Sequence, residues 1–313
     1  MNSWRPAGES GVDVLCGDQM RPHRDSEEQD IRSPMDLRKF ADALRPLPGW
    51  IGGGILDWYQ LGLRKPRDAT TYYGATIHCD PVDSIQRSII YYGVWEPGIS
   101  RIIESSLEPG DLFVDIGANI GYDAMLAATR ADVVAIEAAP HIYRKMLRNL
   151  EINRDLADHI RPVNVAVSDH AGELDLYDFG PRNIGATTTL PSRKGKKCAT
   201  VAAAPLLDIL SPEELARVRL IKMDVEGAET TILNDIFDHI DAFPENMSII
   251  FEANPEDDQA AFDVMFKRIQ QNFAAYEVEN GYSNAWYLKW KGGPLNELQT
   301  APKRRTDILL TRA

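Results

Sequence analysis

Residues 111–130 read DLFVDIGANIGYDAMLAATR, and this stretch decides the fold class. The short apolar run LFVDI predicts a buried strand, and the residues after the glycines carry apolar side chains at the spacing of a helix. Gly117, Asn119 and Gly121 lie in the turn between the two. A glycine-rich turn that joins a strand to a helix indicates the ligand-binding edge of an open α/β sheet.

The same alternation of strand and helix patterns continues along the chain. Strands that are apolar throughout and alternate with helices predict a mostly parallel sheet with helices on both faces. The tail is expected to add closing antiparallel strands. The further strand segments are DVVAIEA, IRPVNVAVSD, RLIKMD and MSIIFEAN, and the tail segments are AAYEVEN, AWYLKW and TDILLTR.

The sequence divides into three parts. Residues 1–33 are rich in charge, proline, glycine and serine, which predicts a mobile arm because such a segment buries little apolar area. Residues 34–109 form a preface of helices and strands, in which the run GWIGGG is expected to end the first helix. Residues 110–313 form the sheet domain, and residues 172–204 are expected to make an excursion over its ligand edge.

Composition excludes several classes of function. The 313 residues carry a formal net charge of −13, a sign that repels phosphate backbones and excludes nucleic acid as a partner. No apolar run approaches the ~20 residues of a membrane span, and the first residues lack the pattern of a secretory signal. Three scattered cysteines without a C-x-x-C pair favour a reducing, cytoplasmic location. The sequence leaves a homodimer open.

The residues of the turn discriminate between ligands. A nicotinamide or flavin site needs a glycine where this chain has Asn119, because the backbone must approach a pyrophosphate closely. Asp115 places a carboxylate where a phosphate would lie, and Glu137 ends the second strand at the position that binds a ribose diol. This set favours S-adenosylmethionine, which has a sulfonium and a ribose but no phosphate. Two other interpretations stay open: Asp115 caps the following helix, or the turn binds a nicotinamide cofactor.

Five segments together resemble the FkbM family of adenosylmethionine-dependent methyltransferases, from about residue 74 to residue 252. The resemblance implies the seven-stranded, mostly parallel sheet of class I methyltransferases and methylation of a hydroxyl on a polyketide, sugar or glycolipid. Two features depart from the family: residues 205–208 read PLLD where the family has threonine-leucine-aspartate, and the first 50 residues have no counterpart. The segments are YYGVWEPG, PGDLFVDIGANIGYDAMLAA, IEAAPHIYRKMLRNLEIN, VNVAVSDHAGELDLY and IKMDVEGAE.

The resemblance also implies which residues bind the methyl donor. Its methionine part is expected beside the turn and the WEPG string, its ribose at the end of the second strand, and its adenine after the third. In that order, the residues are Asp115, Gly117, Asn119, Gly121 and Glu96, then Glu137 and Ala138, then Val167 and Ser168.

The fourth strand carries the candidate catalytic groups. An alcohol must lose its proton on methylation, which calls for a base or a metal. Asp224 and Glu226 follow this strand beside the donor, which Asp224 is also expected to contact. Lys222 lies on the same face as Asp224, so the two form either part of the catalytic set or a buried structural ion pair. Glu226 either contacts the substrate or caps the next helix.

Asp224, Glu252 and Asn254 together make an all-oxygen set of the kind that Mg²⁺ prefers. Catechol-type methyltransferases have an adjacent pair on strand five, whereas Glu252 and Asn254 are two residues apart. We therefore favour metal-free chemistry over the magnesium alternative.

These inferences predict an adenosylmethionine-dependent O-methyltransferase that acts on a hydroxylated small molecule, namely a secondary metabolite, a polyketide or a saccharide. Two alternatives remain. One is an N-methyltransferase, and the other is a catalytically silent binding protein with the same fold.

Overall fold

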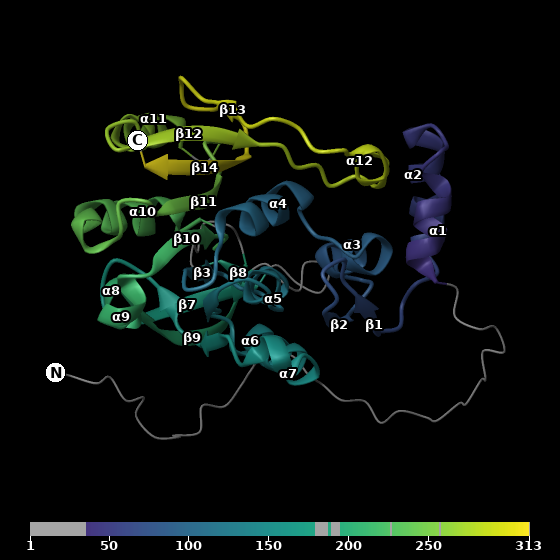
Figure 1. The fold of residues 1–313 in the computed structure, drawn as a ribbon, viewed down its shortest axis with the longest axis horizontal. Coiled ribbons are helices and arrows are strands. Elements are labelled where there is room, and N and C mark those ends of the chain that lie inside the picture. Colours follow the sequence, from purple (N-terminus) through teal and green to yellow (C-terminus); the bar gives the residue numbers. More distant parts are fainter. Residues whose placement is uncertain (1–35, 179–186, 189–194, 226, 257, 313) are drawn as a thin grey trace.

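The computed structural model describes residues 36–178, 187–188, 195–225, 227–256 and 258–312, and Figure 1 shows how their elements are arranged. The predicted arm at 1–33 and part of the predicted excursion lie outside the described residues. The helices are α1 Leu37–Leu44, α2 Gly49–Gln60, α3 Ser84–Tyr92, α4 Pro97–Ser106, α5 Tyr122–Ala128, α6 Pro140–Ile152, α7 Arg154–Ala157, α8 Leu206–Ile209, α9 Pro212–Leu215, α10 Glu229–Asp238, the 3₁₀ turn η2 Ile240–Ala242, α11 Gln259–Ile269 and α12 Asn284–Lys289. The strands are β1 Arg67–Thr70, β2 Thr76–Cys79, β3 Leu112–Ile116, β4 Asp132–Ile136, β5 Ile160–Val163, β6 Ala166–Val167, β7 Gly172–Asp178, β8 Thr187–Thr188, β9 Lys196–Ala204, β10 Val218–Met223, β11 Ser248–Ala253, β12 Phe273–Val278, β13 Asn296–Glu297 and β14 Thr306–Arg312.

The main sheet has the strand order β13-β12-β14-β11-β10-β3-β4-β5. Strands β11, β10, β3, β4 and β5 are parallel neighbours, and β14 runs antiparallel to both β11 and β12. The two-residue strand β13 adds to the edge of the seven strands of a class I methyltransferase sheet, so the predicted fold class is confirmed. Strand order reverses at β3, which makes the carboxyl ends of β3 and β10 the place where such sheets bind ligands.

The sheet is covered on both faces, as the apolar strands predict. Alternate strand residues point to opposite faces: Phe113 of β3 joins a core with helices α4, α5 and α6. Val114 joins a second core with helices α8, α10 and α11 on the other face. Asp115 therefore shares a face with Phe113 and lies on the side of α4 and α5.

The segment 160–169, expected as one strand, is divided between two sheets. Its first half is β5 of the main sheet, and its second half is β6, which pairs with β9. Strands β6, β9, β7 and β8 form a second, four-stranded sheet that contains the described part of the 172–204 excursion. Asn164 lies just after β5, where the chain leaves the main sheet, and it donates hydrogen bonds of 2.7 and 3.0 Å to the carbonyls of Glu137 and Ala138.

Two local expectations for the preface and the tail are wrong. The run GWIGGG does not end a helix but begins α2, and AWYLKW is helix α12 in place of a strand. The two helices pack closely: a Cβ on Gly53 would lie 2.8 Å from the Ala285 nitrogen, and one on Gly52 would lie 2.8 Å from a Leu288 methyl. Glycine lowers helix propensity, but here its lack of a side chain permits the contact between α2 and α12.

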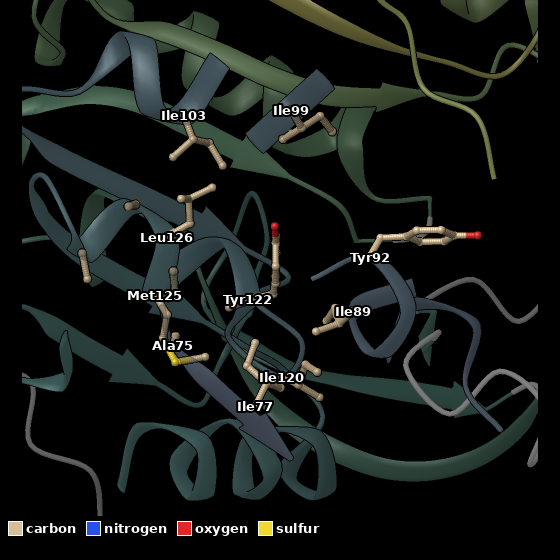
Figure 2. Packing of buried hydrophobic residues seen from close by; sticks show 14 of the residues in the cluster. Ala75, Ile77, Ile89, Tyr92, Ile99, Ile103, Ile120, Tyr122, Met125 and Leu126 are labelled. Atoms are coloured by element: carbon tan, nitrogen blue, oxygen red, sulfur yellow. The ribbon is translucent and has the colours of Figure 1, made fainter. Parts of the chain in front are cut away.

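The preface packs directly on the sheet domain. Figure 2 shows side chains of β2 and α3, including Ile77 and Ile89, gathered with Ile120, Tyr122 and Met125 from the β3–α5 region. The hydroxyl of Tyr73 donates a 2.8 Å hydrogen bond to the carbonyl of Tyr122. The two regions thus share one hydrophobic core. Within the described ranges, no helix combines the length and the apolar character needed to cross a membrane.

Candidate active site

The turn after β3 lies against the end of β10. Gly117 has φ +86°, and a Cβ at this position would collide with the carbonyl oxygen of Asp224. The backbone N–H of Asp224 in turn donates a 3.0 Å hydrogen bond to the carbonyl of Ile116. Glycine is required at position 117 because the two strand ends approach each other here without space for a side chain.

Glu137 is fixed beside this turn by backbone hydrogen bonds. Its Oε2 accepts from the N–H of Asn119 at 2.9 Å, and its Oε1 accepts from the N–H of Ala139 at 2.8 Å. Asn119 has φ +51°, an uncommon conformation for a residue with a side chain. In this conformation its own N–H points at the carboxylate of Glu137. Burial raises the pKa of Glu137 to about 7, against those two hydrogen bonds. Each oxygen retains a lone pair for a further donor.

Lys222 is a buried ammonium surrounded by carboxyl groups. Its Nζ lies 3.2 Å from Oδ2 of Asp123 and 3.7 Å from Oδ2 of Asp224, and Lys222 pairs in register with Asp115 on β3. Burial alone would lower the pKa of Lys222, but the carboxylates of Asp123, Asp224 and Asp115 raise it well above its usual value. Lys222 therefore stays positively charged beside these carboxylates.

Asp115 is fully buried on the same face. Neither of its carboxyl oxygens has a hydrogen-bond partner in the described chain, nor does Oδ1 of Asp123. Burial raises the pKa of Asp115 to about 7, an effect that Lys222 opposes and Asp123 reinforces. Helix α5 is capped by Gly121 with no side-chain hydrogen bond, so Asp115 is not its cap. That alternative is excluded, and the unpartnered oxygens need another explanation.

Glu96, in the preface, lies near the charged cluster of Lys222, Asp123 and Asp224. It adopts φ +42°, ψ +69° just before α4, where a residue with a side chain is strained. Its Oε1 accepts a 3.0 Å hydrogen bond from the Tyr282 hydroxyl, whereas its buried Oε2 has no partner among the described residues. Burial and the nearby Asp307 carboxyl raise the pKa of Glu96 well above its usual value. Glu96, Lys222, Asp224, Glu252 and Asp307 line one small cleft.

Two residues of the magnesium alternative, Asp224 and Glu252, line the same cleft. Oε1 of Glu252 forms an ion pair with Nε of Arg305 at 2.6 Å. Burial and the nearby Asp224 raise the pKa of Glu252 to about 8, although Arg305 acts to lower it. Asn254 follows the end of β11. In the described ranges, no three His, Cys, Asp or Glu side chains have the geometry of a metal site.

The remaining predicted residues lie along the same edge or outside the described chain. Ser168 follows β6, where its N–H donates to the carbonyl of Ala204 at 3.0 Å, and Val167 precedes it. Glu226 lies outside the described residues. The N–H groups on either side of it, of Val225 and Gly227, donate to Glu229 at 3.3 and 2.9 Å.

Four residues of this site were missed by reasoning from the sequence. Asp123 stands alone among apolar residues of α5, and a lone carboxylate in an apolar helix was a signal that could have been used. Asp307 is the second residue of the last strand, β14, and accepts a 2.7 Å hydrogen bond from Asn280. Glu229 and Tyr282 have no comparable signal, because their partners are defined only by the folded loops.

The charges of the cluster fit a cationic ligand. One buried ammonium, that of Lys222, is shared by Asp115, Asp123, Asp224 and Glu96. Buried carboxylates are stable only when they are paired, and three of these four have oxygens without a hydrogen-bond partner in the part of the chain that is described. A ligand that brings positive charge and hydroxyl donors to this edge, as a sulfonium amino acid joined to a ribose does, complements both the cluster and Glu137.

Comparison with known proteins gives an independent result. Residues 115–283, more than half of the chain, match the family model described as the methyltransferase FkbM domain. Over 183 residues the chain is 26% identical to the hexuronic acid methyltransferase AglP of Haloferax volcanii, a match that covers 57% of this chain and 73% of that protein. Over 201 residues it is 28% identical to the methyltransferase sdnD of Sordaria araneosa, covering 54% and 73%. A solved FkbM methyltransferase from Methylobacillus flagellatus KT has a TM-score of 0.41 and 12% identity, covering 72% of this chain and 52% of that one.

Proposed function

The chain belongs to the FkbM family of adenosylmethionine-dependent methyltransferases, and we propose that it methylates a hydroxyl group of a small molecule, a saccharide or another secondary metabolite. The proposed location of the reaction rests on one observation. The ammonium of Lys222 interacts with several buried carboxyl groups at the carboxyl ends of β3 and β10, where open α/β sheets bind their ligands.

The donor is held in this proposal by groups of the two strand ends. The carboxylate of Glu137 accepts the ribose hydroxyls, because its two oxygens are already oriented by Asn119 and Ala139. Asp115 and Glu96 face the positively charged methionine part. Ala138, Val167 and Ser168 border the adenine. Gly117 and Gly121 keep side chains out of the turn, where φ is +86° and +88°.

The bound donor supplies a methyl group on a sulfonium carbon, which an aligned oxygen attacks by in-line displacement. What the chain contributes is alignment and a place for the acceptor's proton. Asp224 is suited to receive that proton, because its side chain lines the cleft and is 35% exposed. The side chain of Lys222 is only 5% exposed, and its ammonium lies 3.7 Å from Oδ2 of Asp224. Lys222 is a positioning residue in this scheme. Glu226 remains the other candidate base.

The acceptor class rests on two further observations. AglP acts on a hexuronic acid, so a sugar acceptor is the natural first hypothesis for this chain. Beside the cleft, the exposed ring of Tyr282 stacks on Trp95 with centroids 5.4 Å apart, and the Tyr282 hydroxyl bonds to Glu96. Aromatic rings present a broad apolar surface with a polar edge, which suits the C–H face and hydroxyls of a sugar.

The decisive experiment is product analysis. The full chain is incubated with adenosylmethionine labelled in the methyl group and with a panel of uronic acids, neutral glycosides and polyketide alcohols. Mass spectrometry then locates the label. A methyl ether or ester supports the O-methyltransferase, a label on nitrogen favours an N-methyltransferase, and donor binding without any product favours a silent binding protein.

A further inference from the structure

Helix α2 carries an apolar stripe that the rest of the described chain leaves exposed. Trp50 is 77% exposed, Trp58 is 75% exposed, and Leu61, just after the helix, is 68% exposed. Residues four apart lie above one another on a helix, so Trp50, Gly54 and Trp58 form one row and Leu61 extends it. Large exposed apolar surfaces of this kind mark interaction sites.

Gly54, at the centre of the row, has no explanation within the described chain. Gly52 and Gly53 are required by the close contact of α2 with α12, where a Cβ would lie 2.8 Å from a neighbouring atom. A Cβ on Gly54 would have nothing within 4 Å. Glycine in a helix interior lowers stability relative to alanine, so nothing in the described part of the fold accounts for Gly54.

The spacing of the row is symmetric. Trp50 lies four residues before Gly54, and Trp58 lies four residues after it. In a two-fold dimer, each residue contacts a partner residue that makes the reciprocal contact. We propose that α2 packs antiparallel on α2 of a second copy, with the two-fold axis at Gly54, so that Trp50 of each copy packs on Trp58 of the other.

This arrangement assigns a role to each residue of the row. Without a Cβ at position 54, the two helix backbones can approach closely, as small residues permit at helix interfaces. The indoles on either side then cover the partner's backbone and lose their exposure to water. Tryptophan is enriched among residues that dominate the binding energy of protein interfaces.

The charges near the row favour a protein partner over a lipid surface. Helices that lie on bilayers carry lysine and arginine on their polar face, whereas α2, GWIGGGILDWYQ, contains neither. Its single charged residue, Asp57, borders the row and accepts hydrogen bonds from Gln60 at 3.5 Å and Asn284 at 2.7 Å. The chain's net charge of −13 also opposes binding to anionic lipids.

Two measurements on the full chain test the proposal. The first is sedimentation equilibrium at micromolar concentrations. The natural chain is expected to dimerise, and Trp50→Ser, Trp58→Ser and Gly54→Leu are each expected to raise the dissociation constant roughly tenfold or more. Gly54→Leu is the sharpest variant, because the open space at Gly54 lets the single copy fold at least as stably while the close approach is blocked. A natural chain that stays monomeric, or a Gly54→Leu variant that dimerises normally, overturns the proposal.

The second measurement is disulfide trapping in a background with Cys16→Ser and Cys198→Ser. Gly54→Cys lies on the axis and is expected to cross-link to itself. Trp50→Cys is the matched control: it lies about 12 Å along the helix from its own counterpart, too far for a disulfide, and is expected to cross-link only when mixed with Trp58→Cys. The two-fold contact is contradicted if Trp50→Cys cross-links to itself and Gly54→Cys does not. It is also contradicted if the chain is a monomer that floats with lipid vesicles and loses this binding when Trp50 or Trp58 is replaced.

Discussion

The backbone N–H of Asn119 donates a 2.9 Å hydrogen bond to Oε2 of Glu137. This bond joins the turn after β3, which is expected to bind the methionine part of the donor, to the end of β4, which is expected to bind its ribose. Because Ala139 holds the other oxygen, the carboxylate is oriented before any ligand arrives. Such preorganisation lowers the ordering cost of binding.

Replacing Glu137 with alanine is expected to weaken adenosylmethionine and adenosylhomocysteine alike. Hydrogen bonds from ribose hydroxyls to a carboxylate contribute about 1.5–3 kcal/mol each, so affinity should fall at least roughly tenfold. Calorimetry measures the loss, and a thermal melt of the same variant separates lost binding from lost folding. Glu151→Ala on the exposed surface of α6 is the matched control.

A deoxy ligand sharpens this test. If Glu137 binds the diol, a 2′-deoxyribose analogue of adenosylhomocysteine should bind the natural chain more weakly than the parent ligand does. It should bind the Glu137→Ala variant nearly as well as the parent does. Equal losses in both proteins would remove Glu137 from the ribose site.

Replacing Asp224 with asparagine is expected to depress turnover far more than donor affinity. The amide retains the shape of the side chain but cannot take the acceptor's proton, and losing a general base costs typically ~10²–10⁴-fold in rate. The steady-state rate and the calorimetric donor affinity are compared for Asp224→Asn, for Glu226→Gln, and for Asp241→Asn as an exposed control. Wild-type turnover in both Asp224→Asn and Glu226→Gln would assign the base to another part of the cleft.

Chelation is expected to leave activity unchanged. Oε1 of Glu252 is ion-paired with Arg305 at 2.6 Å, and the positive charge of Arg305 disfavours a second cation at Glu252. The rate is measured after EDTA treatment and again after adding Mg²⁺. Activity that EDTA abolishes and Mg²⁺ restores would revive the set of Asp224, Glu252 and Asn254.

Donor affinity is expected to rise as the pH rises through about 7. Burial raises the pKa values of Asp115 and Glu137 to about 7, so both carboxyl groups bind protons in the folded chain at a pH where they would be ionised in the unfolded chain. Their protonation therefore favours folding at lower pH, and this contribution is lost as the pH rises from their unfolded values, near 4, to about 7. The cationic donor prefers the ionised forms that appear over the same range.

The thermal shift caused by the donor measures this linkage. It should be larger near pH 8 than near pH 6, and Asp115→Asn should flatten the dependence. Glu108→Gln, an exposed carboxyl replaced far from the cluster, should preserve it. A shift that is independent of pH in the natural chain would mean that neither carboxyl group titrates against the donor.

Removing residues 1–33 is expected to leave donor binding intact, since their composition predicts that they bury little apolar area. The trimmed chain begins just before α1, which packs in the core through Leu37 and Ala41. Calorimetry on the natural and trimmed chains checks this. A trimmed chain that folds but no longer binds the donor would make the segment part of the site.

Much of the sheet domain could be predicted from the sequence because its strands are recognisable from short local patterns of apolar residues. LFVDI, DVVAI and the segment before Asp224 are apolar runs of strand length, and parallel strands bring their carboxyl ends to one edge. This is why Asp115, Glu137 and Asp224, distant in sequence, could be assigned together before their geometry was known.

The errors lie where tertiary contacts override local preference. Gly52 and Gly53 indicate a break by propensity, but their contact with α12 stabilises a helix. The segment AWYLKW has strand-forming aromatic residues, yet Tyr287 stacks on Tyr92 with centroids 4.6 Å apart from within a helix. The family resemblance placed Glu96 near the donor. Its strained backbone and its hydrogen bond from Tyr282 could not be predicted, because they depend on two loops that sequence periodicity does not describe.

A crystal structure of the chain with adenosylhomocysteine would test the proposed donor site most directly. We expect both ribose hydroxyls to donate to Glu137, the amino acid part to lie beside Asp115 and Glu96, and the sulfur to face the cleft lined by Asp224. A ligand whose ribose lies away from Glu137, or whose amino group lies away from the carboxylates around Lys222, would contradict the proposed site.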